Sequence, residues 1–297
     1  MTPMSTKEPF FYGGQAVIEG VLMRGRTTYA VAVRRPDGEI QVKREPLKSV
    51  VYTSRFWKLP FLRGLAGLWE MLHLGMSALT YSANVQAAGE EIELSPRAIG
   101  ATIGIAVALG LLLFLGLPLL AAGLLGRGHS ALRFTLIEGM VRIALLLLYL
   151  YAISLAPDVR RVFQYHGAEH KTINAFENEV TLDVSGIQTQ SMLHPRCGTG
   201  FLLAVMVVSV FVFSLAGRPS LLLLVLSRLL LIPLIASVAY EGIRFAGRHR
   251  RNRMVRVLVI PLLATQRLTT REPDDRQIEV ALAAFRAARQ EEEEAAA

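Results

Sequence analysis

Three of the six histidines and the only cysteine fall within one short stretch of the chain. His166 and His170 are four residues apart, and His194 precedes Cys197 by three residues. Imidazole nitrogens and a cysteine thiolate are common zinc ligands in proteins. Residues i and i+4 share a face of a helix, so His166 and His170 could bind one ion together. The stretch therefore predicts a site for zinc or another divalent metal.

A carboxylate accompanies these histidines. Glu169 directly precedes His170, as in the H-x-x-E-H pattern of inverted zinc peptidases. We expect Glu169 to act as a general base toward water activated by the metal, or to support a ligand. Cys197 precedes an apolar segment, so a helix N-terminus could favour its thiolate. Glu177 and Arg196 lie in the same stretch and are candidates for supporting the site.

The number of protein ligands separates a catalytic metal from a structural one. Four ligands close a tetrahedral zinc site, whereas a catalytic zinc keeps one position open. His166, His170, His194 and Cys197 could together staple the segment without catalysing a reaction. A third alternative has no metal, with the histidines hydrogen-bonded to carboxylates or lipid phosphates. The residues alone leave all three open, and we favour a catalytic ion.

Four apolar blocks must position this stretch. They cover residues 98–125, 134–156, 200–216 and 220–240. Each is long enough to cross about 30 Å of hydrocarbon, and 52% of all residues are hydrophobic. The sequence therefore predicts a mainly α-helical, polytopic membrane bundle with about four spans. Only Gly217, Arg218 and Pro219 separate the last two blocks, which predicts an antiparallel hairpin.

The basic residues predict how the bundle is oriented. They gather in the N-terminal region, between the second and third blocks, and after the fourth block, and such segments are usually cytoplasmic. Residues 157–199 then form a cytoplasmic loop, and both termini are cytoplasmic. This distribution accounts for the net charge of +8, so no nucleic-acid partner is expected. The basic run 244–256 could bind anionic membrane lipids, although retention of topology explains it equally well.

The ends of the chain contain weaker signals. Residues 29–33 and 40–42 are β-prone runs on either side of the turn signal Pro36-Asp37-Gly38, so residues 13–47 predict a small β element. Gly13, Gly14 and Gly20 predict tight turns nearby. Apolar residues at helical spacing in 59–81 predict an amphipathic helix that lies in the membrane interface or packs on the bundle.

The chain therefore divides into six parts. They are 1–58 with the β element, 59–90 with the interfacial helix, 91–156 with two spans, 157–199 with the metal site, 200–240 with the hairpin, and 241–297, a basic region that ends in a helical segment and an acidic tail.

Three charged residues fall inside the predicted spans. Glu138 and Arg142 are four residues apart and can pair, and Arg228 falls at a similar depth. Charges within a bilayer are costly, so a polar pathway or ligand site is one explanation. A structural clamp between helices is the explanation that we favour, because buried charges must be paired.

Four segments together resemble one family. They are GGQAVIEGVLMRG (13–25), RVFQYHGAEHKTI (161–173), HPRCGT (194–199) and QRLTTREPDD (266–275). The chain resembles the YqhQ-like family of bacterial membrane proteins, over about residues 11–285. The family is of unknown function and is described as predicted metal-dependent enzymes. The resemblance implies a polytopic protein of the bacterial inner membrane, but no substrate.

The resemblance also directs attention to polar residues outside the central stretch. Glu19 and Arg24 belong to the first segment, and Arg271 and Asp274 to the last. They could fold back on residues 157–199 and support the site, or they could form a polar network that ties the termini to the bundle.

The sequence thus predicts a membrane-embedded, metal-dependent hydrolase, with zinc as the expected metal and an unknown substrate at the cytoplasmic face. A non-enzymatic scaffold or assembly factor with a structural zinc site is the first alternative. A small-solute transporter that uses Glu138 and Arg228 is the second.

Overall fold

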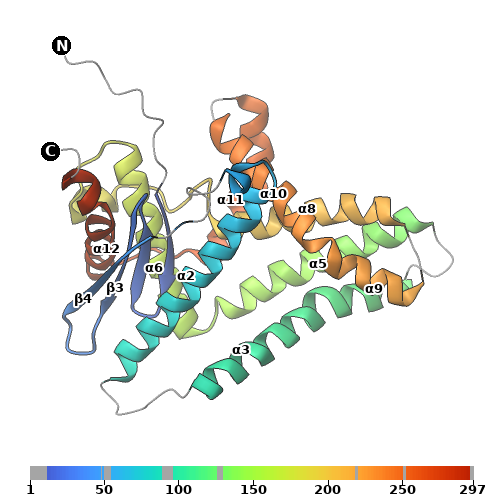
Figure 1. Cartoon of the computed structure of the whole chain (residues 1–297), viewed down its shortest axis with the longest axis horizontal. Helices are drawn as coiled ribbons and strands as arrows, with labels where there is room; N and C mark the ends of the chain where they lie inside the picture. The colour runs from blue at the N-terminus through green and yellow to red at the C-terminus, as the bar shows by residue number, and fades with distance from the viewer. Residues whose placement is uncertain are drawn as a thin grey trace.

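The structure is a computed structural model that describes residues 12–47, 49, 55–88, 96–125, 130–217, 220–249 and 252–294. A four-stranded sheet and the helices that cover it form one part of the molecule, and a bundle of long apolar helices forms the other (Figure 1). The predicted fold class is therefore confirmed. Parts of two predictions, the turn at 218–219 and residues 250–251 of the basic run, lie outside the described residues.

The N-terminal region forms an antiparallel sheet in the order β1-β2-β3-β4. Its strands are β1 (Gly13–Val17), β2 (Gly20–Arg24), β3 (Thr28–Arg34) and β4 (Ile40–Pro46). The two predicted β runs are confirmed as β3 and β4, with Gly38 at φ +93° in the turn between them. A tight turn does precede Gly20, but Gly13 and Gly14 are extended in β1 rather than in a turn.

Successive side chains of a strand point to opposite faces of the sheet. Apolar residues lie on both faces here, and helices cover both. Val21 and Met23 of β2 pack into a core with α6 (Pro157–Glu177) and α12 (Asp275–Glu294). Leu22, between them, packs on the other side with Leu74 and Ala78 of α2 (Leu62–Ala87). The helix predicted within 59–81 is therefore confirmed as a helix, and one of its faces is occupied by the sheet.

This layered domain combines three segments that are distant in the sequence. The N-terminal sheet and α2, the central α6, and the C-terminal α12 share a continuous set of buried contacts. Residues 157–199, predicted to connect the second and third spans, contain α6 with its 21 residues and the short α7 (Val184–Gln188). His166 and His170 both lie on α6, so the helical spacing expected for this pair is confirmed. The extent of α6 was not predicted, because its polar residues interrupt the apolar periodicity of a helix.

Within the described residues, four helical stretches are long and apolar enough to cross a membrane. The first combines α3 (Pro96–Leu111), the π-helical turn η2 (Leu112–Gly116) and α4 (Leu117–Leu125); the others are α5 (Ala131–Ile153), α8 (Gly198–Ala216), and α9 (Leu221–Leu230) continued by α10 (Ile232–Arg248). The fourth stretch extends beyond the predicted limit of 240, because α10 continues to Arg248. As predicted, α8 packs against the last stretch.

One helix has no counterpart among the sequence predictions. Helix α11 (Arg253–Thr269) follows α10 and runs across the direction of α5 and α8 (Figure 1). The basic run 244–256 is thus not a single segment, since it is divided between the end of α10 and the start of α11. A short 3-10 helix, η1 (Phe56–Lys58), precedes α2.

Candidate metal centre

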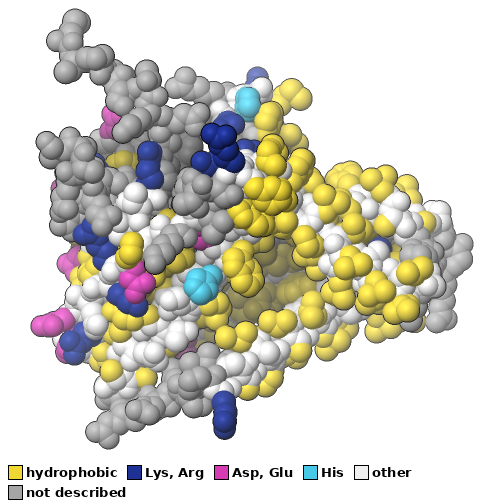
Figure 2. Space-filling view, in the orientation of Figure 1, with side chains coloured by type: hydrophobic (Ala, Val, Ile, Leu, Met, Phe, Trp, Pro, Cys, Tyr) yellow, Lys and Arg dark blue, Asp and Glu magenta, His cyan; other side chains and the backbone are white. Residues whose placement is uncertain are grey.

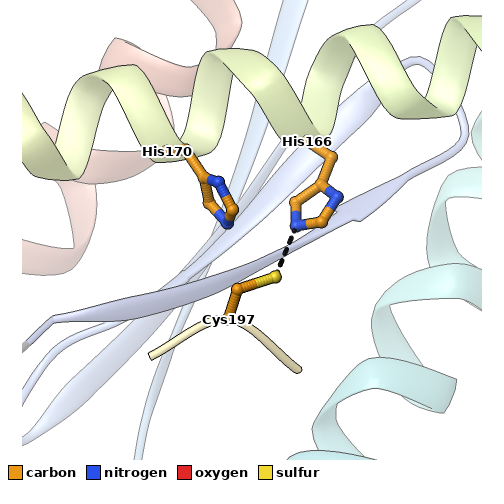
Figure 3. Close-up of side chains that lie close together, drawn as sticks. All are labelled: His166, His170 and Cys197. Atoms are coloured by element: carbon orange, nitrogen blue, oxygen red, sulfur yellow. Dashed lines mark hydrogen bonds between the residues drawn. The ribbon is translucent and has the colours of Figure 1, made fainter. Parts of the chain in front are cut away.

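Helix α6 brings the two central histidines to the cysteine. His166 and His170 project from the same face of α6 toward Cys197, which is the N-cap of α8 (Figure 3). Cys197 Sγ lies 3.3 Å from His166 Nε2, and the ligand atoms of all three residues lie within 4.8 Å of one another. Ligand atoms around a tetrahedral zinc are about 3.3–3.6 Å apart. The three side chains could therefore hold one metal ion after a small contraction.

Backbone carbonyls orient both imidazole rings. His166 Nδ1 lies 2.8 Å from the carbonyl oxygen of Thr269, and His170 Nδ1 lies 2.5 Å from that of Met192. A carbonyl oxygen can only accept, so Nδ1 carries the proton in each ring. The lone pair of a neutral ring is then on Nε2, and this arrangement is usual for metal-binding histidines.

Side chains fix the segments that provide these carbonyls. The Gln266 amide bonds the backbone of His194 twice, accepting from its N–H at 2.9 Å and donating to its carbonyl at 2.7 Å. Asn174 of α6 donates to the carbonyl of Ser191 at 2.7 Å. The residues before α8 are therefore held against α6 and the end of α11, which keeps Cys197 in place.

Glu169 lies buried between α6 and the sheet. The Gly14 N–H of β1 bonds its carboxylate, and a Cβ at Gly14 would lie only 2.8 Å from Glu169 Cγ. Its Oε2 is 4.0 Å from His166 Nε2. Burial raises the pKa of the Glu169 carboxyl to about 7, against the opposing effects of His166 and the Gly14 N–H. A carboxyl with such a pKa can accept or donate a proton near neutral pH.

His194 lies beside the cluster. Its ring centroid is 5.5 Å from that of His170, and its buried Nε2 has no hydrogen-bond partner among the described residues. Burial lowers the pKa of His194, which favours the neutral ring. Such an orphaned atom is usually satisfied by water or a ligand. His194 is not among the side chains whose ligand atoms lie within 4.8 Å of one another, so it could bind the same ion only after a shift toward His166, His170 and Cys197.

Glu177 forms an ion pair with Arg196, and its Oε2 is 3.9 Å from His194 Nε2. Burial alone would raise the pKa of Glu177, but His194 and Arg196 outweigh it and lower the pKa to about 2. The pair ties the last turn of α6 to the segment before α8. The geometry thus places Glu177 and Arg196 in a support around the cluster.

The two polar residues of the first family segment contact other helices. Glu19, at φ +51° in the β1–β2 turn, pairs with Arg161 at the start of α6. Arg24 pairs with Glu70 of α2 at 2.5 Å. Both contacts fix the sheet to its covering helices.

The last family segment returns the chain from α11 to the domain. The Arg271 N–H donates to the carbonyl of Phe163 in α6 at 2.9 Å. Asp274 accepts from the Gln277 N–H at 2.8 Å, and the Gln277 side chain accepts from the Asp274 N–H at 3.0 Å, which is a capping box at the start of α12.

The three charged residues of the bundle are in contact, as predicted from their similar depth within the apolar spans. The Glu138 carboxylate lies between Arg142 and Arg228, with Arg228 Nη2 2.7 Å from Oε2. Arg142 also donates to Ser209 Oγ at 3.0 Å and to the carbonyl of Phe114 in η2 at 2.9 Å. All three charged side chains are buried. Their contacts connect several helices at one level of the bundle.

Comparison with known proteins connects this geometry to a family. Residues 59–291 match the family described as "Protein of unknown function (DUF1385)". The chain belongs to this family. A relative from Bacillus subtilis (strain 168), named "Uncharacterized protein YqhQ", is 36% identical over 294 residues, covering 94% of this chain and 92% of the relative. The family resemblance is thereby confirmed, and no solved structure matches the chain.

The DUF1385 match includes the whole cluster, from His166 to Cys197, and all four apolar stretches. Sequence reasoning missed the carbonyls of Met192 and Thr269, because any residue type offers the same backbone oxygen. It also assigned no contact to Gly14 or Gln266. The only signal was their place in the segments 13–25 and 266–275, which carried the family resemblance.

Proposed function

We propose that this protein is a metal-dependent hydrolase of the bacterial inner membrane, with zinc as the expected metal. His166, His170 and Cys197 would hold the ion. Glu169 would act as the general base that accepts a proton from the attacking water. The supporting observation is that three ligand-type side chains converge within 4.8 Å while both histidine Nδ1 atoms face carbonyl oxygens. That orientation favours Nε2 coordination, since histidines that bind metals usually donate their other ring N–H to a carbonyl or carboxylate oxygen.

The donor set suits catalysis because three protein ligands leave one tetrahedral position open. When bound, the metal supplies Lewis-acid chemistry, polarising a carbonyl or phosphoryl oxygen and activating water. Glu169 Oε2 lies 4.0 Å from His166 Nε2, so this carboxylate would lie beside a metal ion held by His166 and could accept a proton there. His166 is the most exposed of the three ligands, with 16% of its side chain accessible, so the substrate would approach past this ring.

The location of the cluster supports a substrate met at the membrane surface. Cys197 immediately precedes α8, one of the four candidate spans. The layered domain contains segments from both ends and the middle of the chain, which supports an arrangement with all of them on one side. The basic residues near the spans favour the cytoplasmic side.

A structural zinc site in a scaffold or assembly factor is the second candidate. His170, Cys197 and Glu169 are each more than 90% buried, which favours a closed site. Glu169 or His194 could provide a fourth ligand after a small movement, and four ligands leave no open position.

Metal analysis of the detergent-purified protein separates these functions. We expect about one zinc per chain in the wild type, as in tetrahedral zinc sites. His170→Asn should lose the metal, and His73→Asn, at an exposed position of α2, should retain it. The absence of zinc and other divalent metals from the wild type would contradict both candidates.

Glu169→Gln is the decisive variant. Under the hydrolase proposal it retains the metal but fails in a hydrolytic screen with ester, peptide and phosphoester substrates in which the wild type is active. Loss of the metal would identify Glu169 as a fourth ligand and favour the scaffold. Unchanged hydrolysis would refute its role in proton transfer.

A further inference from the structure

Helix α11 presents an apolar face to its surroundings. Met254 and Leu258 are 76% and 72% exposed, and Val257 and Ile260 are more than half exposed. These residues fall in the first half of the helix, whereas the second half packs on α8 and buries Gln266 and Thr269. An exposed apolar surface of this kind marks a contact with a membrane or another protein.

Helix α2 has a similar division. Leu74 and Ala78 are buried against the sheet, whereas Trp69, Leu72 and Met76 are exposed. The three exposed residues recur at intervals of three and four, so they form a stripe along one side of the helix. Trp69 is 74% exposed, which is unusual for so large an aromatic side chain in water.

Both helices are joined to the bundle. The Arg63 guanidinium of α2 pairs with Glu241 of α10, and Gly64 packs against the Tyr240 ring. In Figure 1, α11 runs across the bundle axis beside the layered domain. Figure 2 shows hydrophobic side chains that continue from the bundle over the region of α10 and α11, with basic side chains beside them.

We propose that α11 and α2 lie in the interfacial layer of the membrane, on the side of the layered domain. The occupant of their apolar faces is the lipid bilayer itself, because the face of α11 continues the apolar surface of the bundle and the exposed stripe of α2 lies on a helix that is attached to α10. Trp is typical of this layer, and Arg253 and Arg256 beside the apolar residues of α11 suit lipid phosphates. Amphipathic helices of this kind lie in the plane of the interface.

This position couples the membrane to the candidate metal centre. The same helix that immerses Leu258 also provides the Thr269 carbonyl to His166 and the Gln266 amide to His194. The cluster is therefore held at the depth of the lipid headgroups. The membrane contact itself does not depend on whether a metal binds.

Fluorescence quenching by brominated phosphatidylcholine tests the immersion in reconstituted vesicles. Trp57→Phe leaves Trp69 as the only tryptophan, and Leu258→Trp in a variant that lacks both natural tryptophans reports on α11. Val42→Trp in the same background is the matched control, because Val42 is exposed on β4, the strand farthest from the bundle (Figure 1).

We expect Trp69 and the residue at 258 to lose most of their fluorescence in shallow-brominated lipid, and the residue at 42 to lose little. If Leu258→Trp does not fold, Val257→Trp on the same face replaces it. Equal quenching at 42 and 258 would overturn the proposal. So would an unquenched 258 reporter whose emission changes with protein concentration, since a second copy of the chain would then cover the face.

Discussion

At the scale of single residues, the cluster depends on contacts made by atoms other than the proposed ligands. His166 and His170 become suitable ligands because carbonyl oxygens occupy their Nδ1 atoms. Glu169 acquires its raised pKa because it is buried beneath a glycine that leaves room for it. Gly14 and Gln266 therefore help to position the side chains that would touch a metal.

Gly14→Ala should destabilise the protein and displace Glu169. The new Cβ would lie 2.7 Å from the Leu22 carbonyl and 2.8 Å from Glu169 Cγ, so the strand or the carboxylate must move. Overpacking of this kind costs about 1–3 kcal/mol. Thermal unfolding in detergent measures the loss. Gly13→Ala is the matched control, since nothing lies within 4 Å of a Cβ there, and equal losses for both variants would contradict the account.

Gln266→Leu should weaken metal binding. It leaves the buried N–H and carbonyl of His194 without their partners, at a cost of about 1–3 kcal/mol for each group. Loss of such outer contacts lowers metal affinity by about 10–100-fold. Titration with a competing chelator measures the affinity, with Gln41→Leu, on the exposed side of β4, as control. Unchanged affinity would show that Gln266 does not position the site.

At the scale of elements, hydropathy predicted the spans because a bilayer imposes a length and a composition. Strands β3 and β4 were predicted from β-prone runs. Strands β1 and β2 were not predicted, because their glycines were interpreted as turn residues. The spacing of His166 and His170 indicated a helix, but the extent of α6 was not predicted, because its buried face carries polar residues such as Lys171 and Thr172, which an apolar pattern cannot reveal. Helix α11 was missed because Pro261 and scattered arginines interrupt its apolar residues.

Asp274→Ala should weaken the attachment of α12. The variant removes the carboxylate that accepts from the Gln277 N–H at the first turn. Loss of such a cap costs about 1 kcal/mol. Thermal unfolding should show the decrease for Asp274→Ala but little change for Asp274→Asn, which retains an oxygen acceptor. An equal decrease in both variants would mean that the negative charge, rather than the cap, is required.

At the scale of the whole molecule, two buried systems hold distant segments together. The layered domain unites the two ends of the chain with α6, and the group Glu138, Arg142 and Arg228 unites the bundle. The group contains two cations and one anion, so Glu138 satisfies both arginines. This arrangement favours a structural clamp over the pathway of a transporter.

Glu138→Gln should therefore be more damaging than Arg228→Met. The first variant leaves two guanidinium groups without an anion inside the bundle, and breaking a buried pair costs about 3–5 kcal/mol. The second leaves Glu138 paired with Arg142. Melting temperatures of the two variants in detergent provide the comparison. A stable Glu138→Gln beside an unstable Arg228→Met would contradict the clamp.

Cysteine labelling tests whether the three segments of the layered domain share one side of the membrane. Glu39, in the turn between β3 and β4, and Thr189, after α7, are exposed. Ser220, at the start of α9, is exposed at the other end of the bundle. The natural Cys197 is buried, so it should contribute little background.

With an impermeant maleimide on intact spheroplasts, we expect Ser220→Cys to react, and Glu39→Cys and Thr189→Cys to react only after permeabilisation. Opposite results for Glu39→Cys and Thr189→Cys would be incompatible with their packing in one domain. Reaction of both in intact spheroplasts would instead invert the orientation and place the metal centre outside the cytoplasm.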